Sequence, residues 1–172
     1  MAGRGRAKCA AAAAICAAAF LASGCGGGHA AARTSTVAGL APGPERASLA
    51  ARYLAIAKAG NRRLNVDFDG LEHGDWKHLS RARADLRDAA ATERLFDRRV
   101  LRIAFPPGIE GVVRSLYRVN QARAGLTVAA ARSASLRVLQ SYEHRLDAAN
   151  VPVEQRVKKI RRYLGLPPPP SG

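Results

Sequence analysis

The amino-acid sequence predicts an all-α fold, an antiparallel bundle of about four helices. Alanine, the strongest helix former, supplies 36 of the 82 apolar residues. Valine, isoleucine and threonine, which favour strands, number only 20 among 172 residues. Residues 79–103 also repeat apolar side chains at three- and four-residue intervals, and that spacing indicates a long amphipathic helix. The length of the chain suits a single domain.

Glycine and proline divide the body of the chain, residues 45–166, into four predicted helices. The first runs from about residue 45 to 65 and carries apolar side chains along one face. The second runs from about residue 75 to 103, with Asp75 as its N-cap. Pro106 ends the second helix, because the residue before a proline avoids the helical region.

The third predicted helix begins after Pro107 and continues to about residue 149. Small residues fill its middle around Gly125, where we expect either a close helix crossing or a kink. The fourth helix begins at Asn150–Pro152, because proline suits a first helical turn. Gly165 is its predicted C-cap. Short connections between helices of this kind favour an antiparallel bundle.

The chain is strongly basic, with 28 Lys and Arg against 13 Asp and Glu and a formal net charge of +15. Its apolar fraction of 48% excludes a disordered chain. The net positive charge therefore favours anionic partners, and the apolar content is sufficient for a folded core.

The first 25 residues have the organisation of an export signal. Arg4, Arg6 and Lys8 form a basic start, and the uncharged apolar residues 9–21 follow. This run is too short to span a bilayer, which takes about 20 apolar residues. It has the length of the apolar part of a signal peptide.

The segment that closes this run, Leu21-Ala22-Ser23-Gly24-Cys25, resembles the lipobox of bacterial lipoprotein signal peptides. The resemblance implies that the Cys25 thiol receives a diacylglyceryl group and that Cys25 becomes the first residue of the mature chain. Ala22 stands where that family usually has leucine. We therefore expect a palmitate-type lipid anchor, firm because two acyl chains share it, on the extracytoplasmic face of the cell membrane.

Four segments follow from this organisation. We expect a lipoprotein signal peptide over residues 1–24 and a flexible tether that joins Cys25 to residue 44. The helical bundle occupies residues 45–166, and residues 167–172 form a disordered proline-rich tail.

Several stretches of the body are similar to short, uncharacterised helical lipoproteins of high-GC Gram-positive bacteria. The likeness extends over most of residues 53–170, and none of its stretches is a motif of known chemistry. The resemblance therefore implies no active residue. The stretches are Tyr53–Ala57, Ala82–Glu93, Phe105–Pro107, Asn120–Ala124 and the ending Leu164–Pro167.

Residues 65–70, Asn-Val-Asp-Phe-Asp-Gly, match the first half of an EF-hand calcium loop. The second half does not match, because Glu72 occupies an apolar position and Trp76 stands where the bidentate glutamate belongs. Asp, Asn and Gly also favour turns for conformational reasons. We therefore expect an interhelical turn here and no calcium site.

Acidic and histidine side chains gather around the same predicted turn. They lack the His-x3-His or Glu-x-x-His spacing that builds metal sites in helical bundles. We therefore expect a solvated turn, with no metal and no other cofactor. The weak metal candidates are Asp67, Asp69, His73 and His78.

Glu93 is an unusual residue in the second predicted helix. The apolar repeat points it inward, and a buried carboxylate must find a partner or become neutral. Asn120 and Arg123 lie on a face of the third helix that can meet it. Three roles are open: a structural ion pair that fixes helix register, a side chain that reaches solvent at the seam, or an acidic group that lines a ligand site.

The sequence carries no nucleophile–base–acid arrangement and no phosphate-binding loop, so we expect no enzyme. A pI of about 11.1 would suggest nucleic acid in a cytosolic protein. An exported lipoprotein instead meets anionic lipids and acidic wall polymers, and we expect no nucleic-acid partner. The expected function is a non-enzymatic binding or scaffolding module that meets an envelope protein. The alternative is a carrier of a small ligand or metal, in the bundle interior or in the loop from Asp67 to His78.

Overall fold

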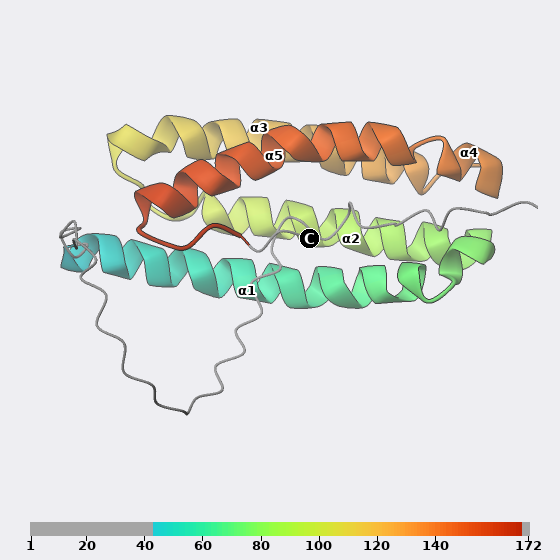
Figure 1. Cartoon of the computed structure of the whole chain (residues 1–172), viewed down its shortest axis with the longest axis horizontal. Helices are drawn as coiled ribbons and strands as arrows, with labels where there is room; N and C mark the ends of the chain where they lie inside the picture. The colour runs from blue at the N-terminus through green and yellow to red at the C-terminus, as the bar shows by residue number, and fades with distance from the viewer. Residues whose placement is uncertain (1–42, 170–172) are drawn as a thin grey trace, which may run out of the picture.

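The computed structural model of the chain describes residues 43–169, and these form an antiparallel helical bundle (Figure 1). No strand occurs in this part of the chain, so the predicted all-α fold is confirmed. Two short helices lie in the connections at one end of the bundle. The elements in chain order are α1 (Pro44–Glu72), the 3-10 helix η1 (Asp75–Lys77), α2 (Leu79–Val100), α3 (Pro107–Ala130), α4 (Leu136–Gln140) and α5 (Glu143–Tyr163).

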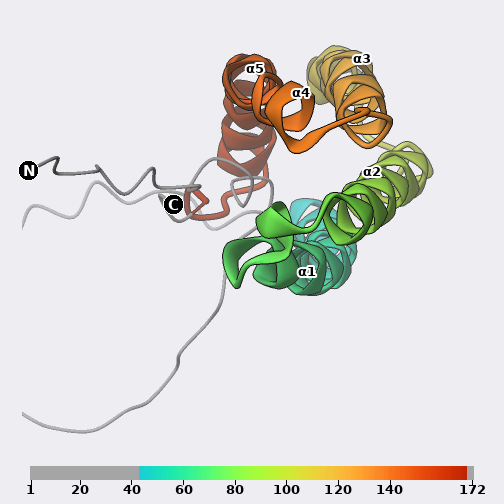
Figure 2. The ribbon, with the colours of Figure 1, turned by 90° about the vertical axis from the view of Figure 1, so that its right-hand side faces the viewer.

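The four long helices pack in sequence, α1 on α2, α2 on α3 and α3 on α5. Seen along the bundle, α1 lies below α2 and the pair α3 and α5 lies above them (Figure 2). The start of α1 and the end of α5 lie at the same end of the bundle (Figure 1). The signal-peptide, Cys25 and tether predictions fall outside the described residues. No helix among residues 43–169 has the length and apolar character needed to cross a membrane.

The core consists of two apolar clusters. The smaller one lies at the end that holds η1 and α4 and includes Leu71, Leu86 and Leu139. Alanines with no exposed surface, such as Ala89 and Ala124, line the helix seams and allow close approach. The larger cluster contains Leu49, Ala50, Tyr53, Ala57, Leu64, Ala89, Phe96, Val100, Ile103, Phe105, Ile109, Val113, Leu116, Val153, Val157, Ile160 and Leu164.

The predicted interhelical turn at residues 65–70 is wrong, because α1 continues through it to Glu72. Leu71 is buried in the smaller cluster and Phe68 packs against both clusters. This burial outweighs the turn preference of Asn, Asp and Gly. Gly70 serves close packing, since a Cβ there would lie 3.0 Å from Asp75 Oδ2.

The connection to α2 also differs from the prediction. The turn comes at Gly74, whose φ of 126° favours glycine. Asp75 begins η1 and does not cap α2, which starts at Leu79 after His78. The other end of α2 is Val100, although Ile103 remains buried in the turn that follows.

The predicted third helix is in fact divided. Gly125 lies exposed inside α3, and a Cβ there would meet no atom within 4 Å, so no other helix crosses close to it. The chain turns after Ala130, and the Ser135 hydroxyl accepts a hydrogen bond from the Val138 N–H at the start of α4. Side chains of serine favour turns and caps over helix interiors, which explains the break.

Pro152 lies inside α5 and does not begin a helix. A proline there removes one backbone hydrogen bond. The buried side chains of Asn150, Val153 and Val157 continue at helical spacing across it, and their packing offsets that loss.

The end of α5 is as predicted. Gly165 has φ 69°, its N–H donates to Arg162 O at 3.1 Å, and the Leu166 N–H donates to Arg161 O at 2.8 Å. The Arg161 Nε–H also donates to Pro167 O at 2.6 Å. Pro167, assigned by the sequence to a disordered tail, is therefore held against α5.

Candidate functional site

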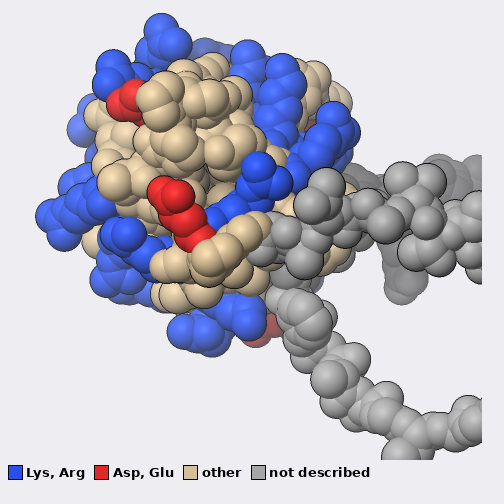
Figure 3. Space-filling view, turned by 90° about the vertical axis from the view of Figure 1, so that its left-hand side faces the viewer, with Lys and Arg blue, Asp and Glu red and all other residues tan. Residues whose placement is uncertain are grey.

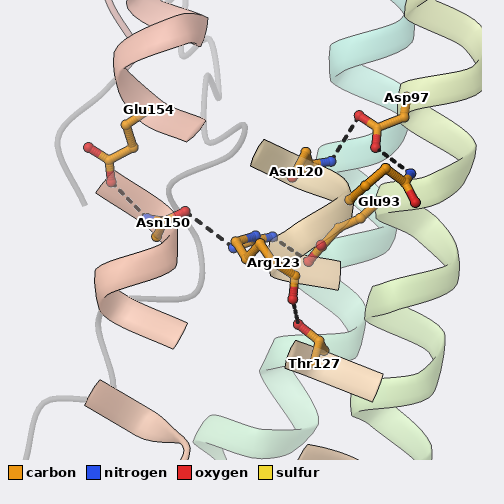
Figure 4. A network of polar contacts seen from close by, with 8 residues as sticks. Glu93, Asp97, Asn120, Arg123, Thr127, Asn150 and Glu154 are labelled. Carbon is orange, nitrogen blue, oxygen red and sulfur yellow. Dashed lines mark hydrogen bonds and ion pairs between the residues drawn. The ribbon is translucent and has the colours of Figure 1, made fainter. Parts of the chain in front are cut away.

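A layer of polar side chains crosses the bundle interior and joins α2, α3 and α5 (Figure 4). Each helix contributes residues at helical spacing on one face, which is why side chains far apart in sequence converge. The layer is built from Glu93 and Asp97 of α2, Asn120, Gln121, Arg123 and Thr127 of α3, and Asn150 and Glu154 of α5.

Glu93 and Arg123 form the centre of this layer. Glu93 is 1% exposed and Arg123 is 4% exposed. An Nη2–H of Arg123 donates to Glu93 Oε1 in a close, charge-assisted contact. Burial raises the pKa of Glu93, and the facing Arg123 guanidinium partly offsets that rise. The inward position of Glu93 and its pairing with Arg123 are confirmed, and a glutamate that reaches solvent is excluded.

Asp97 lies one turn beyond Glu93 and is also buried. Its Oδ1 accepts a hydrogen bond from Asn120 Nδ2 at 2.9 Å, and its Oδ2 accepts one from Gln121 Nε2 at 2.8 Å. Burial raises the pKa of Asp97 to about 6 against the opposing effect of these two amides. Asn120 therefore binds Asp97, whereas the sequence had placed it beside Glu93.

The third part of the layer connects Arg123 to the surface. An Nη1–H of Arg123 donates to Asn150 Oδ1 at 3.2 Å. The Asn150 Nδ2–H donates to Glu154 Oε1 at 2.8 Å, and Lys158 Nζ lies 3.5 Å from Glu154 Oε2. The Thr127 hydroxyl donates to the Arg123 backbone carbonyl at 3.2 Å. This chain of contacts ties α5 to α3 through a single arginine.

Three buried polar atoms of the layer have no hydrogen-bond partner among the described residues: Glu93 Oε2, Asn120 Oδ1 and Arg123 Nε. Two of them are acceptors and one is a donor. A water molecule or a small polar group with both donor and acceptor character would satisfy them.

The layer can fix helix register, because Glu93, Asp97 and Arg123 each find their partner on another helix only in one alignment. Asp97 was missed by sequence reasoning, as were Gln121, Asn150 and Glu154. The signal for Asp97 was its four-residue spacing from Glu93, which puts both carboxylates on one helix face. Asn150 was hidden by the mistaken helix start at Pro152.

The weak metal candidates do not gather into a site. Asp67 and Asp69 are two positions apart on α1, so their side chains point to different sides of the helix. Asp69 is exposed, with its Oδ1 3.1 Å from His73 Nδ1, and His78 is exposed just before α2. Among residues 43–169, no group of three or more His, Cys, Asp or Glu side chains is arranged to hold a metal ion.

Asp67 has a different environment from the one predicted. Burial raises its pKa to about 6, the nearby Asp88 carboxylate adds to the rise, and the Thr92 hydroxyl opposes it by hydrogen bonding. Asp67 therefore belongs to the α1–α2 contact and not to an interhelical loop.

Comparison of the chain with protein-family models, with curated proteins and with solved structures found no match.

Proposed function

We propose that this protein is a lipid-anchored protein of the extracytoplasmic face of the cell membrane. The observation that carries the proposal is the Leu21–Cys25 segment, which follows a basic start and a short apolar run. In this proposal Cys25 holds the membrane lipid and the helical bundle is the part that meets other molecules.

We propose further that the bundle serves as a non-enzymatic binding or scaffolding module. The polar side chains of its interior support this, because Glu93, Arg123 and Asn150 bind one another across three helices. Such mutual pairing stabilises a fixed shape, which suits a scaffold better than a reactive centre.

The anchor can be tested by expressing the full chain in a high-GC Gram-positive host and measuring the mass of its mature N-terminal peptide. We expect a diacylglyceryl-modified cysteine at residue 25. Cys25→Ser should abolish the modification and leave the chain unprocessed or released, whereas the matched Cys16→Ser variant should keep it. An unmodified N-terminus at another residue in the wild-type chain would disprove the anchor.

A second candidate function is transport or sensing of a small polar ligand in the bundle interior. The three buried atoms without partners at Glu93, Asn120 and Arg123 favour it. Native mass spectrometry of the chain purified from its host would show a bound small molecule, and Asn120→Leu should remove it. A wild-type chain that carries only water there would leave the scaffold as the function.

A further inference from the structure

The two ends of the bundle differ sharply in charge. We define the basic end as residues 44–60, 97–120 and 152–166, and the far end as residues 61–96 and 121–151. The boundary passes through two contacts between helices, one beside Gly60 and Phe96 and the other joining Asp97 to Asn120. The basic end has 13 Lys and Arg against 4 Asp and Glu, and the far end has 11 against 9. Most of the net charge of the bundle, +9 against +2, therefore lies at one end.

The surface of the basic end shows this directly. Figure 3 faces that end, where the start of α1 and the ends of α2 and α5 meet. Blue basic side chains surround a tan area, and red acidic side chains are few, although one lies near the middle of the face. Several exposed bases there form no ion pair with any acid of the described residues, among them Arg99, Arg102, Lys159 and Arg162. Their positive charge is free to attract an anionic partner.

An apolar side chain accompanies these bases. Leu101 is 43% exposed and lies between Arg99 and Arg102 in the turn that follows α2. Ile103 and Phe105, in the same turn, are buried in the larger core cluster and hold it in place. Basic side chains next to an exposed leucine suit a lipid surface, because the bases meet headgroup phosphates and the leucine meets the acyl boundary.

The position of the predicted tether selects a membrane as the partner. Residues 26–43 join Cys25 to the start of α1, which is at the basic end. A chain of this length and composition has a mean span of about 20–25 Å. The far end lies about 40 Å further away, since α1 has 29 residues at about 1.5 Å each. The lipid anchor would thus bring the basic end to the membrane and keep the far end away from it.

We infer that the basic end docks on anionic phospholipid headgroups, so that the bundle stands on the membrane with η1 and α4 pointing outward. This inference rests on the proposed anchoring through Cys25 and adds an orientation and a lipid class to it. Near an anionic surface each base strengthens association by about fivefold, so Arg99, Arg102, Lys159 and Arg162 together would hold the docked state against free rotation.

Hydrogen exchange of the full, acylated chain tests the inference. The chain is reconstituted into vesicles of phosphatidylcholine alone or with phosphatidylglycerol at a 7:3 ratio, and amide exchange is followed by mass spectrometry. We expect exchange in residues 98–108 to slow by about tenfold on the anionic vesicles. Salt at 1 M should remove the effect, because it shortens the Debye length to about 3 Å.

Two matched variants locate the effect. Replacing Arg99, Arg102, Lys159 and Arg162 by glutamine should abolish the slowing. Replacing four exposed bases of the far end, Arg62, Arg87, Arg132 and Arg137, changes the net charge equally and should leave it intact. The wild-type comparison of the two vesicle types is decisive even if a variant does not fold.

Three results would overturn the docking. The first is equal amide exchange on neutral and anionic vesicles. The second is slower exchange at the far end of the bundle in place of the basic end. The third is slower exchange of residues 98–108 with a soluble acidic polymer but not with anionic vesicles. The last result would assign the basic end to wall polymers. Failure of the anchor is recognised separately, by the mass of the N-terminal peptide, and does not depend on the exchange rates.

Discussion

The ion pair between Glu93 and Arg123 provides the strongest test of the buried layer. Replacing Glu93 by alanine removes the carboxylate and leaves a buried guanidinium whose remaining side-chain partner is Asn150 Oδ1 at 3.2 Å. Removal of one member of a buried pair costs about 3–5 kcal/mol of unfolding free energy. Because the contact with Asn150 remains, we expect Glu93→Ala to cost about 3 kcal/mol. Glu93→Gln should cost less, since an amide oxygen can still accept from Arg123.

The double variant Glu93→Leu/Arg123→Met removes both charges and keeps most of the side-chain volume. It should cost about 1 kcal/mol or less, because neither ion then has to be taken out of water. Urea denaturation at pH 7 of the wild type, Glu93→Leu, Arg123→Met and the double variant gives the coupling energy directly. The exposed pair Glu110–Arg114 is the control, and Glu110→Ala should cost under about 0.5 kcal/mol. The reasoning would be refuted if each single variant lost less than about 0.5 kcal/mol of unfolding free energy. It would also be refuted if the loss in the double variant equalled the sum of the losses in the two single variants.

Two further predictions concern single positions. Because burial raises the pKa of Asp97 from 3.8 to about 6, the folded chain holds a proton that the unfolded chain releases, and the unfolding free energy should fall as pH rises from 5 to 7. Asp97→Asn should reduce this fall in urea melts at the two pH values but not remove it, because burial also raises the pKa of Asp67 to about 6. An unchanged fall in that variant would rule Asp97 out as a source. Gly165→Ala should lower stability by about 1 kcal/mol because of its φ of 69°, whereas Gly125→Ala, exposed within α3, should raise it by a similar amount. Thermal melts that shift in the same direction for both glycine variants would contradict the two conformations.

Sequence reasoning recovered the type of the elements better than their limits. The apolar repeat of residues 79–100 is local, so it predicted α2 with little ambiguity. The course of the chain at residues 65–72 and at Pro152 depends on burial of Leu71 and Val153 against other helices. Local preferences for a turn or a helix start give no access to that tertiary contribution. For this reason α1 continues through the turn predicted at residues 65–70, and α5 continues across the helix start predicted at Pro152.

The buried layer shows the same division between local and tertiary information. Glu93 interrupts an otherwise apolar stripe, so its burial and need for a cation could be predicted. Asp97 is followed by Arg98 and Arg99 and therefore resembled part of an exposed run of charges. From the sequence, Asn120 could bind either Glu93 or Asp97. Which of the two it binds depends on how far α2 is shifted along α3, and in the structure it binds Asp97.

The even number of long helices among residues 43–169 has a practical consequence for work on the living cell. Since α1 begins and α5 ends on the same side of the bundle, labels attached next to Pro44 and next to Tyr163 report on the same neighbourhood. The turn at Gly74 lies on the opposite side, about 40 Å away along α1. An epitope inserted at that turn and one placed at the end of α5 would therefore lie at opposite ends of the bundle. Their relative access to antibodies on whole cells would reveal how the bundle is inclined.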